Sequence, residues 1–209
     1  MKKPIPTTLA REDLAKLSIR SYEGFIRVVS TEDDLHEARR ELHQEYLVGI
    51  DTESRPTFRK GEFYPTSLVQ VATSKAVFLF SLQRIDCSEV LIDLLQNTAI
   101  VKTGIGLAQD FAKLKLGFPF EEKNVVDLSE VARHHGVKQP SVRTLTGLFL
   151  GFRITKGQST SNWGREELSE KQIVYAATDA WVCRELFLRF QQIGFVDAEG
   201  RAIAKKSGG

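Results

Sequence analysis

The sequence that decides the fold is Leu47-Val48-Gly49-Ile50-Asp51-Thr52-Glu53, an apolar run that ends in two carboxylates with one residue between them. Successive residues of a β-strand alternate between the two faces of a sheet, so Asp51 and Glu53 leave the strand on the same side. Like charges held close together in a low dielectric repel by several kcal/mol unless a cation lies between them or one is protonated. A divalent metal explains the pair. The alternative is that the carboxylates cap the next helix or lie hydrated in a loop.

Length and composition favour one large domain. With 209 residues, of which 42% are hydrophobic, the chain can bury a full core. The net charge is only +2, so any contact with nucleic acid must be concentrated in a patch of the 29 Lys and Arg side chains.

The cysteines and the lack of long apolar stretches favour a cytoplasmic protein. Cys87 and Cys183 lie far apart and show no metal-ligand spacing, which argues against a disulfide scaffold and a structural zinc site. The start Met1-Lys2-Lys3-Pro4 is followed by no apolar segment, so we expect no signal peptide. No stretch approaches the ~20 apolar residues that span a bilayer. We therefore expect a soluble protein of the reducing cytoplasm, without membrane contact.

Hydrophobic periodicity predicts an α/β sheet. Strands are expected at about 25–29, 47–53, 67–73, 76–80, 100–102 and 124–126, and helices at about 8–17, 31–45, 88–96, 107–116, 128–135, 143–150 and 170–193. Only Ser74-Lys75 joins the third and fourth strands, and so short a connection permits only antiparallel pairing. The sheet should therefore begin as a meander and continue with alternating strands and helices.

The last helix has the clearest boundaries. Ser169 and Gln172 match a capping box at its start, and Gly194 supplies a C-terminal stop. We expect an N-terminal arm with a short helix at 1–24, the main domain at 25–196, and a flexible tail at 197–209, whose apolar content is low.

Two further carboxylates lie on apolar helix faces. In the last helix Tyr175 and Asp179 are in line with apolar residues three and seven positions beyond Asp179, and Asp110 lies between Leu107 and Leu114 in the same way. Burying an unpaired carboxylate costs several kcal/mol, so each needs a buried cation, hydrogen-bond donors or a metal. A structural ion pair or a cap is the plain alternative for either residue alone.

One common metal centre explains the carboxylates of all three segments together. Divalent cations such as magnesium prefer oxygen ligands, and Asp51, Glu53, Asp110 and Asp179 could hold two of them. That is the layout of a two-metal phosphodiesterase, which stabilises the attacking and leaving oxygens at phosphorus. Tyr175 would orient the attacking water, because an unperturbed phenol titrates near pH ~10 and is a poor base. The alternative for Tyr175 is a core aromatic residue with a bonded hydroxyl.

These residues carry a resemblance to a known family. Asp51-Thr52-Glu53, Asp110 after Val101-Lys102-Thr103-Gly104, and Tyr175-Ala176-Ala177-Thr178-Asp179 resemble the three motifs of the DEDD 3′-5′ exonucleases, and a Tyr four residues before the last Asp resembles the DEDDy branch. The run from Ser161-Asn162-Trp163-Gly164 to Ala180 is similar to the exonuclease domain of the Werner syndrome protein and its bacterial relatives, with ribonuclease D more distant.

The resemblance implies a ribonuclease H-like fold, a mixed sheet with its first three strands antiparallel and helices on both faces. It further implies a 3′-5′ exonuclease domain at 25–196 that releases nucleoside 5′-monophosphates from DNA or RNA with two Mg²⁺ or Mn²⁺ ions. Asp51, Glu53, Asp110 and Asp179 map onto the metal ligands, and Tyr175 onto the water-orienting residue.

Two loops are candidates for binding the nucleic acid. Basic and aromatic side chains there could hold phosphates and stack on bases. The candidates are Phe58 and Arg59 after the acidic strand, Lys156, Asn162, Trp163 and Arg165 before the last helix, and Thr52 between the two carboxylates. For the second loop, the alternative is an ordinary solvated loop with Trp163 folded onto the core.

Other motifs have plainer interpretations. Gly104-Ile105-Gly106 lacks the third glycine of a dinucleotide fingerprint and indicates a close strand-to-helix turn. Asp127 fits a helix N-cap. Gln70, inside an apolar strand, is expected to hydrogen-bond a neighbouring backbone group. The rival to an exonuclease is a non-catalytic nucleic-acid-binding module on the same fold; no obligate protein partner is indicated.

Overall fold

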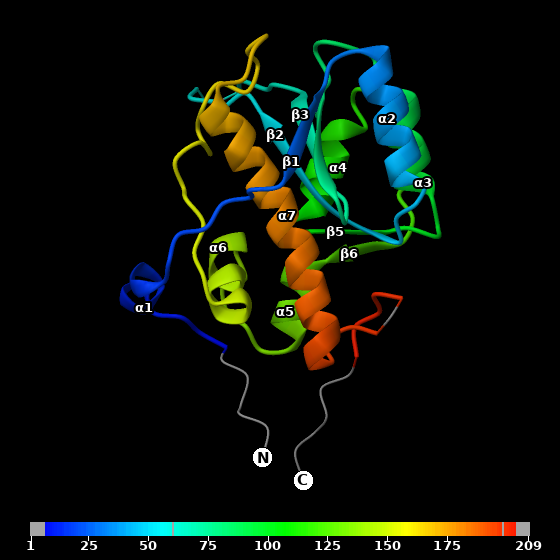
Figure 1. The fold of residues 1–209 in the computed structure, drawn as a ribbon. Helices are drawn as coiled ribbons and strands as arrows, with labels where there is room; N and C mark the ends of the chain where they lie inside the picture. The colour runs from blue at the N-terminus through cyan, green and yellow to red at the C-terminus, as the bar shows by residue number, and fades with distance from the viewer. Residues whose placement is uncertain (1–6, 60, 198, 204–209) are drawn as a thin grey trace.

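A computed structural model describes residues 7–59, 61–197 and 199–203 of the chain (Figure 1). These residues form a six-stranded sheet in the order β1-β4-β3-β2-β5-β6. The strands are β1 (Phe25–Val29), β2 (Leu47–Ser54), β3 (Thr66–Ala72), β4 (Ala76–Ser81), β5 (Val101–Gly104) and β6 (Val125–Asp127). All six lie within a few residues of the ranges predicted from sequence.

The helices alternate with the strands after β4, as predicted. They are α1 (Arg11–Lys16), α2 (Glu32–Leu42), α3 (Ser88–Gln96), α4 (Leu107–Leu114), α5 (Leu128–His134), α6 (Val142–Leu145), η1 (Thr146–Leu150) and α7 (Glu170–Ile193). The helix expected at 143–150 is divided into α6 and the π-helical turn η1, because the Gly151 N–H bonds the Thr146 carbonyl, five residues back, at 3.1 Å. No helix of the described residues is long and apolar enough to cross a membrane.

The capping box of α7 is present. The Ser169 side chain accepts a hydrogen bond from the Gln172 backbone, and the Gln172 side chain accepts one from the Ser169 backbone. Gly194 ends the helix in the left-handed region with φ 78°. The start and end of the longest helix were therefore both predicted correctly.

The sheet is mixed, and its antiparallel part is the meander β2-β3-β4. The expectation that the first three strands are antiparallel holds only when counting starts at β2, because β1 pairs with β4 in parallel and forms one edge. The chain crosses from β1 to β2 through α2, and a helical crossover frees the first strand to add in parallel. β5 and β6 extend the other edge in parallel with β2.

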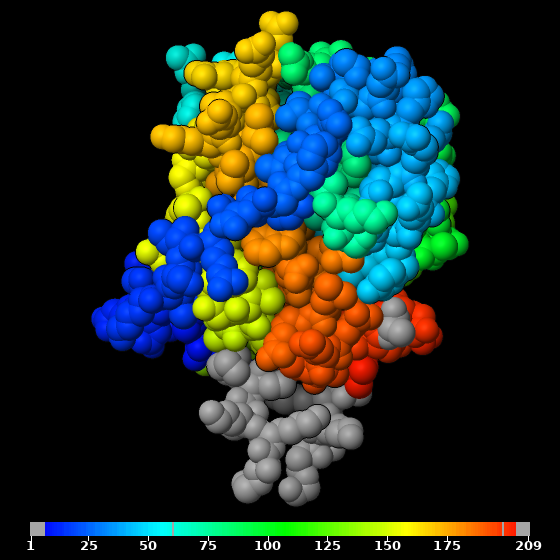
Figure 2. Space-filling model, in the orientation of Figure 1, coloured from blue at the N-terminus to red at the C-terminus, as the bar shows by residue number. Residues whose placement is uncertain are grey.

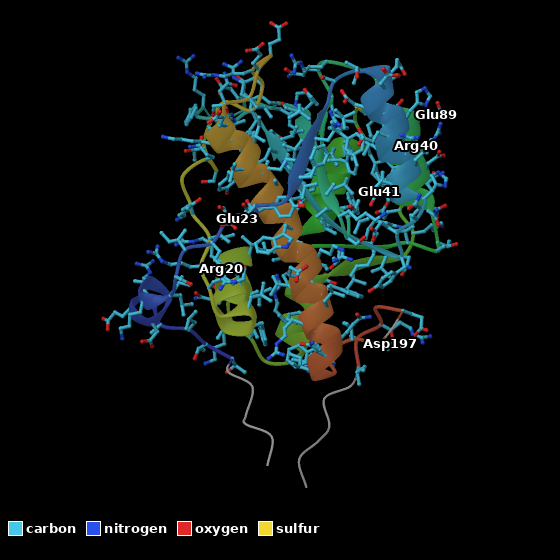
Figure 3. All side chains as sticks on the ribbon, in the orientation of Figure 1. Arg20, Glu23, Arg40, Glu41, Glu89 and Asp197 are labelled. Atoms are coloured by element: carbon cyan, nitrogen blue, oxygen red, sulfur yellow. The ribbon has the colours of Figure 1, made fainter. Side chains whose placement is uncertain are left out.

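Helices cover both faces of the sheet. α7 packs on one face, and α2, α3 and α4 lie on the other (Figure 1). Small side chains of α7, Ala176, Ala177 and Ala180, contact the β3–β4 region of the sheet and are fully buried. On the other side Arg39 of α2 bonds Glu89 and Asp93 of α3 at 2.7 and 2.6 Å, and Glu89 is seen at the outer edge of α3 (Figure 3).

Two glycines permit the helices to approach β2 closely. A Cβ atom on Gly49 would overlap the Ala180 carbonyl oxygen and lie 2.7 Å from the Arg184 nitrogen, so only glycine fits beneath α7. A Cβ on Gly104 would lie 2.5 Å from the Ile50 carbonyl oxygen and 2.6 Å from Leu107. The strand β2 is thereby held tightly between its neighbours just before its acidic end.

The N-terminal arm is bound to the rest of the fold. It crosses the outer side of α7 (Figure 2), where the Tyr22 N–H donates to Thr178 Oγ1 at 3.0 Å. Arg20, labelled in Figure 3 beside α6, donates its N–H to the Arg153 carbonyl at 3.0 Å. At the other end, Val196 pairs with Ala202, so the described residues 199–203 fold back where the sequence predicted a flexible tail. Residues 198 and 204–209 of that tail lie outside the described residues.

Gly49→Ala should destabilise the fold by about 1–3 kcal/mol, because the added methyl group overpacks the contact between β2 and α7. Urea denaturation measures the change in the free energy of unfolding. Gly157→Ala is the matched control, since a Cβ there has no heavy atom within 4 Å. Equal stability of the two variants would contradict the close contact at Gly49.

Candidate active site

Three carboxylates converge where the end of β2 meets α7. Asp51 and Glu53 leave β2 on the face that α7 covers, and Asp179 comes from the buried side of α7. Each contributes an oxygen that lies within 4.8 Å of the other two. The structure thus brings together three of the four predicted acidic residues from two segments far apart in the sequence.

The fourth carboxylate approaches from α4, on the opposite face of the sheet. Thr52 lies between Asp51 and Glu53 on β2, so its side chain points to the opposite face of the sheet. Its hydroxyl donates a hydrogen bond to Asp110 Oδ1 at 2.8 Å. Thr52, predicted to contact substrate, lines the cleft described below, and its hydroxyl also holds Asp110. The negative charge of Asp110 raises the pKa of both Asp51 and Glu53, so the four carboxylates form one electrostatic unit.

Burial raises the pKa of every carboxyl group in this unit, and repulsion from the other carboxylates adds to the rise at Asp51 and Glu53. Burial and the charges of Asp179 and Asp110 raise the pKa of Glu53 to about 9, and burial raises that of Asp179 to about 7. Burial, followed by Asp179 and Glu53, moves the pKa of Asp51 well above its usual value, and burial raises that of Asp110. Four ionised carboxylates are tolerated here only with bound cations, and an all-oxygen set fits Mg²⁺ or Mn²⁺.

Tyr175 lies one turn before Asp179 on α7, as predicted. Burial raises the pKa of Asp179 and the nearby Tyr175 hydroxyl lowers it, and the centre of the Tyr175 ring lies 6.0 Å from that of Trp163. Burial and the neighbouring charges of Asp179 and Glu53 raise the pKa of the phenol above its ordinary value. Tyr175 therefore stays protonated, and it can orient a bound group by hydrogen bonding but cannot serve as a base at neutral pH.

Lys113 is a basic residue of this site that the sequence analysis did not single out. Its Nζ donates to Ser54 Oγ at 3.2 Å, and its charge lowers the pKa of Glu53 and of Asp110. It follows Asp110 by three positions on α4, so the i, i+3 spacing of a helix face was the signal that could have found it.

A cleft of about 350 Å³ opens beside Glu53 and Asp110. The loop after β2 forms its outer wall, where the Arg55 guanidinium lies 4.6 Å from the centre of the Tyr64 ring and Phe63 is 56% exposed. The lining residues are Thr52, Glu53, Ser54, Arg55, Pro56, Thr57, Glu62, Phe63, Tyr64, Asp110 and Lys113. Positive and aromatic side chains thus lie directly beside the acidic cluster.

The predicted binding residues of this first loop are accessible. Phe58 is 80% exposed and Arg59 is exposed, and both lie between Thr57 and Glu62, which line the cleft. They lie near the cleft without lining it. Because both side chains are exposed, they are accessible to a nucleic-acid strand that enters the cleft.

The loop before α7 supplies only part of its predicted set. Lys156, Asn162 and Arg165 are exposed. Trp163 is only 2% exposed and packs in the core with Tyr175, so the prediction that it stacks on bases is wrong and the core alternative is correct. Its large apolar ring is more stable buried between the sheet and α7 than in solvent.

Asp127 and the glycine turn have the structural roles predicted for them. The Asp127 carboxylate accepts hydrogen bonds from the backbone of Gly106, Leu107 and Ser129 at 2.9, 3.2 and 2.8 Å. Gly106 adopts φ 75°, and Gly104 packs against Ile50, as a close strand-to-helix turn requires. Asp127 is therefore a helix cap that also orders the turn into α4.

Comparison with known proteins identifies the family of the chain. The profile of a family described as 3′-5′ exonuclease covers residues 26–194. The chain belongs to this 3′-5′ exonuclease family. It is 33% identical over 192 residues to the human exonuclease mut-7 homolog, covering 77% of this chain and 22% of that protein. It is 30% identical over 155 residues to the mouse bifunctional 3′-5′ exonuclease/ATP-dependent helicase WRN, covering 71% of this chain and 11% of that protein.

Solved structures of other exonucleases show the same fold. The Nibbler EXO domain of Aedes aegypti superposes with a TM-score of 0.73 at 21% identity, covering 84% of this chain and 91% of that one. Escherichia coli RNase D superposes with a TM-score of 0.70 at 20% identity, covering 83% of this chain and 47% of that one. These neighbours have the ribonuclease H-like fold, as predicted. The chain spans less than a quarter of the length of both curated relatives.

In EDTA, the free energy of unfolding should fall as the pH rises from ~4.5, where an unfolded glutamate ionises, to about 9, where folded Glu53 ionises. The folded chain keeps protons that the unfolded chain has released, so each step in pH favours unfolding. Urea denaturation at a series of pH values measures the slope. Asp51→Asn should flatten it, and an unchanged slope in this variant would contradict the coupling.

Mn²⁺ should stabilise the wild-type chain by about 2.7 kcal/mol at 100 times its dissociation constant, because it binds only the folded site. Asp51→Asn should lose most of this gain and should be more stable than wild type in EDTA at neutral pH, since the folded chain no longer has to hold a proton on residue 51 that the unfolded chain releases. Thermal unfolding with and without Mn²⁺ measures both effects. Asp33→Asn, the same change at an exposed position, is the control and should keep the full gain.

Proposed function

We propose that the chain is a metal-dependent 3′-5′ exonuclease that hydrolyses phosphodiester bonds at the 3′ end of a DNA or RNA strand and releases nucleoside 5′-monophosphates. The observation that supports this most strongly is the convergence of Asp51, Glu53 and Asp179 within 4.8 Å, with Asp110 held beside them, in a chain of the 3′-5′ exonuclease family.

Each residue of the site has a distinct role in this proposal. Two Mg²⁺ or Mn²⁺ ions, held by Asp51, Glu53, Asp110 and Asp179, would supply Lewis-acid stabilisation and a water molecule acidified towards neutral pH. Tyr175 stays protonated and orients the attacking water. Thr52 and Asp127 hold Asp110 and the turn before α4 in place. Lys113, beside Glu53, attracts the phosphate to the cleft.

The substrate is a single strand entering along the two loops. Phe58 stacks on bases, and Arg59, Lys156, Asn162 and Arg165 contact the backbone. Among the relatives, Trypanosoma brucei RNase D has been solved in complex with RNA U12, and Aquifex aeolicus DNA polymerase I is also similar in sequence. We therefore include both DNA and RNA. A cytoplasmic location and activity without an obligate protein partner stay predictions.

Asp51→Asn and Asp179→Asn should each lower the rate of release of nucleoside 5′-monophosphates by about 100-fold or more, because several kcal/mol of transition-state stabilisation is lost. The assay follows an oligonucleotide labelled at its 3′ end in the presence of Mg²⁺, with Asp33→Asn as the control. Equally negligible cleavage by wild type and Asp51→Asn would instead favour the non-catalytic binding module.

Phe58→Ala should weaken binding of a single-stranded oligonucleotide by ~1–3 kcal/mol through the loss of base stacking. Arg59→Ala should weaken binding and also reduce its salt dependence. Fluorescence anisotropy in EDTA separates binding from cleavage. Phe25→Ala removes another exposed aromatic ring, at the β1 edge, and should leave the affinity unchanged. Wild-type affinity in both loop variants would exclude this loop from the interface.

A further inference from the structure

Gln70 is a fully buried polar residue in the middle of the apolar strand β3. Its exposed fraction is 0%, and neither Nε2 nor Oε1 has a hydrogen-bond partner among the described residues. The sequence-based expectation that it bonds a neighbouring backbone group is therefore wrong. Burying an amide without a partner costs about 1–3 kcal/mol, so the position calls for an explanation beyond packing.

The sheet register places Gln70 directly beside the acidic cluster. Gln70 lies opposite Asp51 in the antiparallel pair of β2 and β3, and opposite Leu79 on its other side. Residues directly opposite in such a pair point to the same face, with Cβ atoms about 4.5–5.5 Å apart. The Gln70 amide therefore lies in the layer between the sheet and α7, next to the Asp51 carboxylate.

Most of the other side chains packed in this layer are apolar. The residues of β3 and β4 on the same face include Leu68, Ala72, Val77, Leu79 and the buried Ser81, and α7 covers this face with Ala176, Ala177 and Ala180. Two carboxylates lie in this layer, Asp51 directly opposite Gln70 in the sheet and Asp179 of α7 within 4.8 Å of Asp51. The register makes Asp51 the one that is paired with Gln70. A carboxylate that ligates a metal also needs a hydrogen bond to fix its orientation, and such outer partners tune metal affinity.

We propose that Gln70 is a positioning residue for Asp51: its amide N–H, which makes no hydrogen bond in the described part of the structure, turns to donate to the ionised carboxylate and holds it in the orientation that binds metal. The inference rests on the proposed metal-dependent function. Gln70 acts through Asp51 and touches neither metal nor substrate. An amide suits this place because it donates a hydrogen bond without adding a charge to the four carboxylates.

Gln70→Met in the full chain tests the proposal, because Met fills a similar volume without polar atoms. Titration calorimetry with Mn²⁺ should show a dissociation constant about 10–100-fold above that of wild type. Unfolding in EDTA should occur at the same or a higher midpoint, since an unpartnered buried amide has been removed. A residue with a merely structural role would shift the midpoint and leave Mn²⁺ affinity unchanged.

Thr66→Val is the matched control. Thr66 is also on β3, and its buried Oγ1 likewise has no partner among the described residues, but it lies opposite Ser54 and not beside a carboxylate. This variant should bind Mn²⁺ as tightly as wild type. Equal weakening in both variants, or wild-type affinity in Gln70→Met, would overturn the proposal.

Gln70→Leu provides the same readouts if Gln70→Met does not fold. The experiments distinguish a failure of the role proposed for Gln70 from a failure of the proposed function. If wild type binds Mn²⁺ and cleaves but Gln70 variants bind Mn²⁺ normally, only the role of Gln70 is lost. If wild type binds no Mn²⁺, the metal-dependent function and the role of Gln70 are both lost.

Discussion

The close contact between α7 and β2 at Gly49 is the constraint on which the rest of the structure depends. No side chain fits between the strand and the Ala180 carbonyl, so the helix lies directly on the strand two residues before Asp51. Asp179, one residue before Ala180, is thereby carried to the acidic end of β2. Gly104 repeats the arrangement between β5 and β2, next to the turn that leads to α4 and Asp110.

This geometry is electrostatically unfavourable. Packing that brings the helices close also buries like charges, which raises the pKa of Asp51, Glu53, Asp110 and Asp179. The fold tolerates the conflict because strong apolar packing lies on both faces of the sheet. A cluster of carboxylates that is unfavourable by itself, and that divalent cations would stabilise, thus lies where both faces of the sheet are packed.

Much of the fold and of the acidic cluster could be predicted from sequence because both follow from periodicity. Alternation along β2 put Asp51 and Glu53 on one face, and helical spacing put Asp179 inward. What sequence patterns did not predict concerns residues whose environment depends on other segments. Whether Trp163 is buried depends on how its loop folds against α7, and the partner of Thr52 comes from a helix more than fifty residues away.

The register and pairing of the strands also could not be predicted from local sequence patterns. A strand-like sequence at 25–29 predicts a strand but does not specify its neighbour, so the parallel pairing of β1 with β4 was missed. A glutamine in an apolar strand is expected to have a hydrogen-bond partner, and only the sheet register shows that Gln70 lies opposite Asp51. Local propensity therefore predicts elements, whereas the site depends on how they meet.

The convergence of the carboxylates is tested most directly by a crystal structure of the chain from crystals grown with Mn²⁺, using anomalous diffraction to locate the metal. The account predicts anomalous density in contact with carboxylate oxygens of Asp51, Glu53 and Asp179. Density elsewhere, or any of these three carboxylates turned into solvent away from the other two, would contradict it.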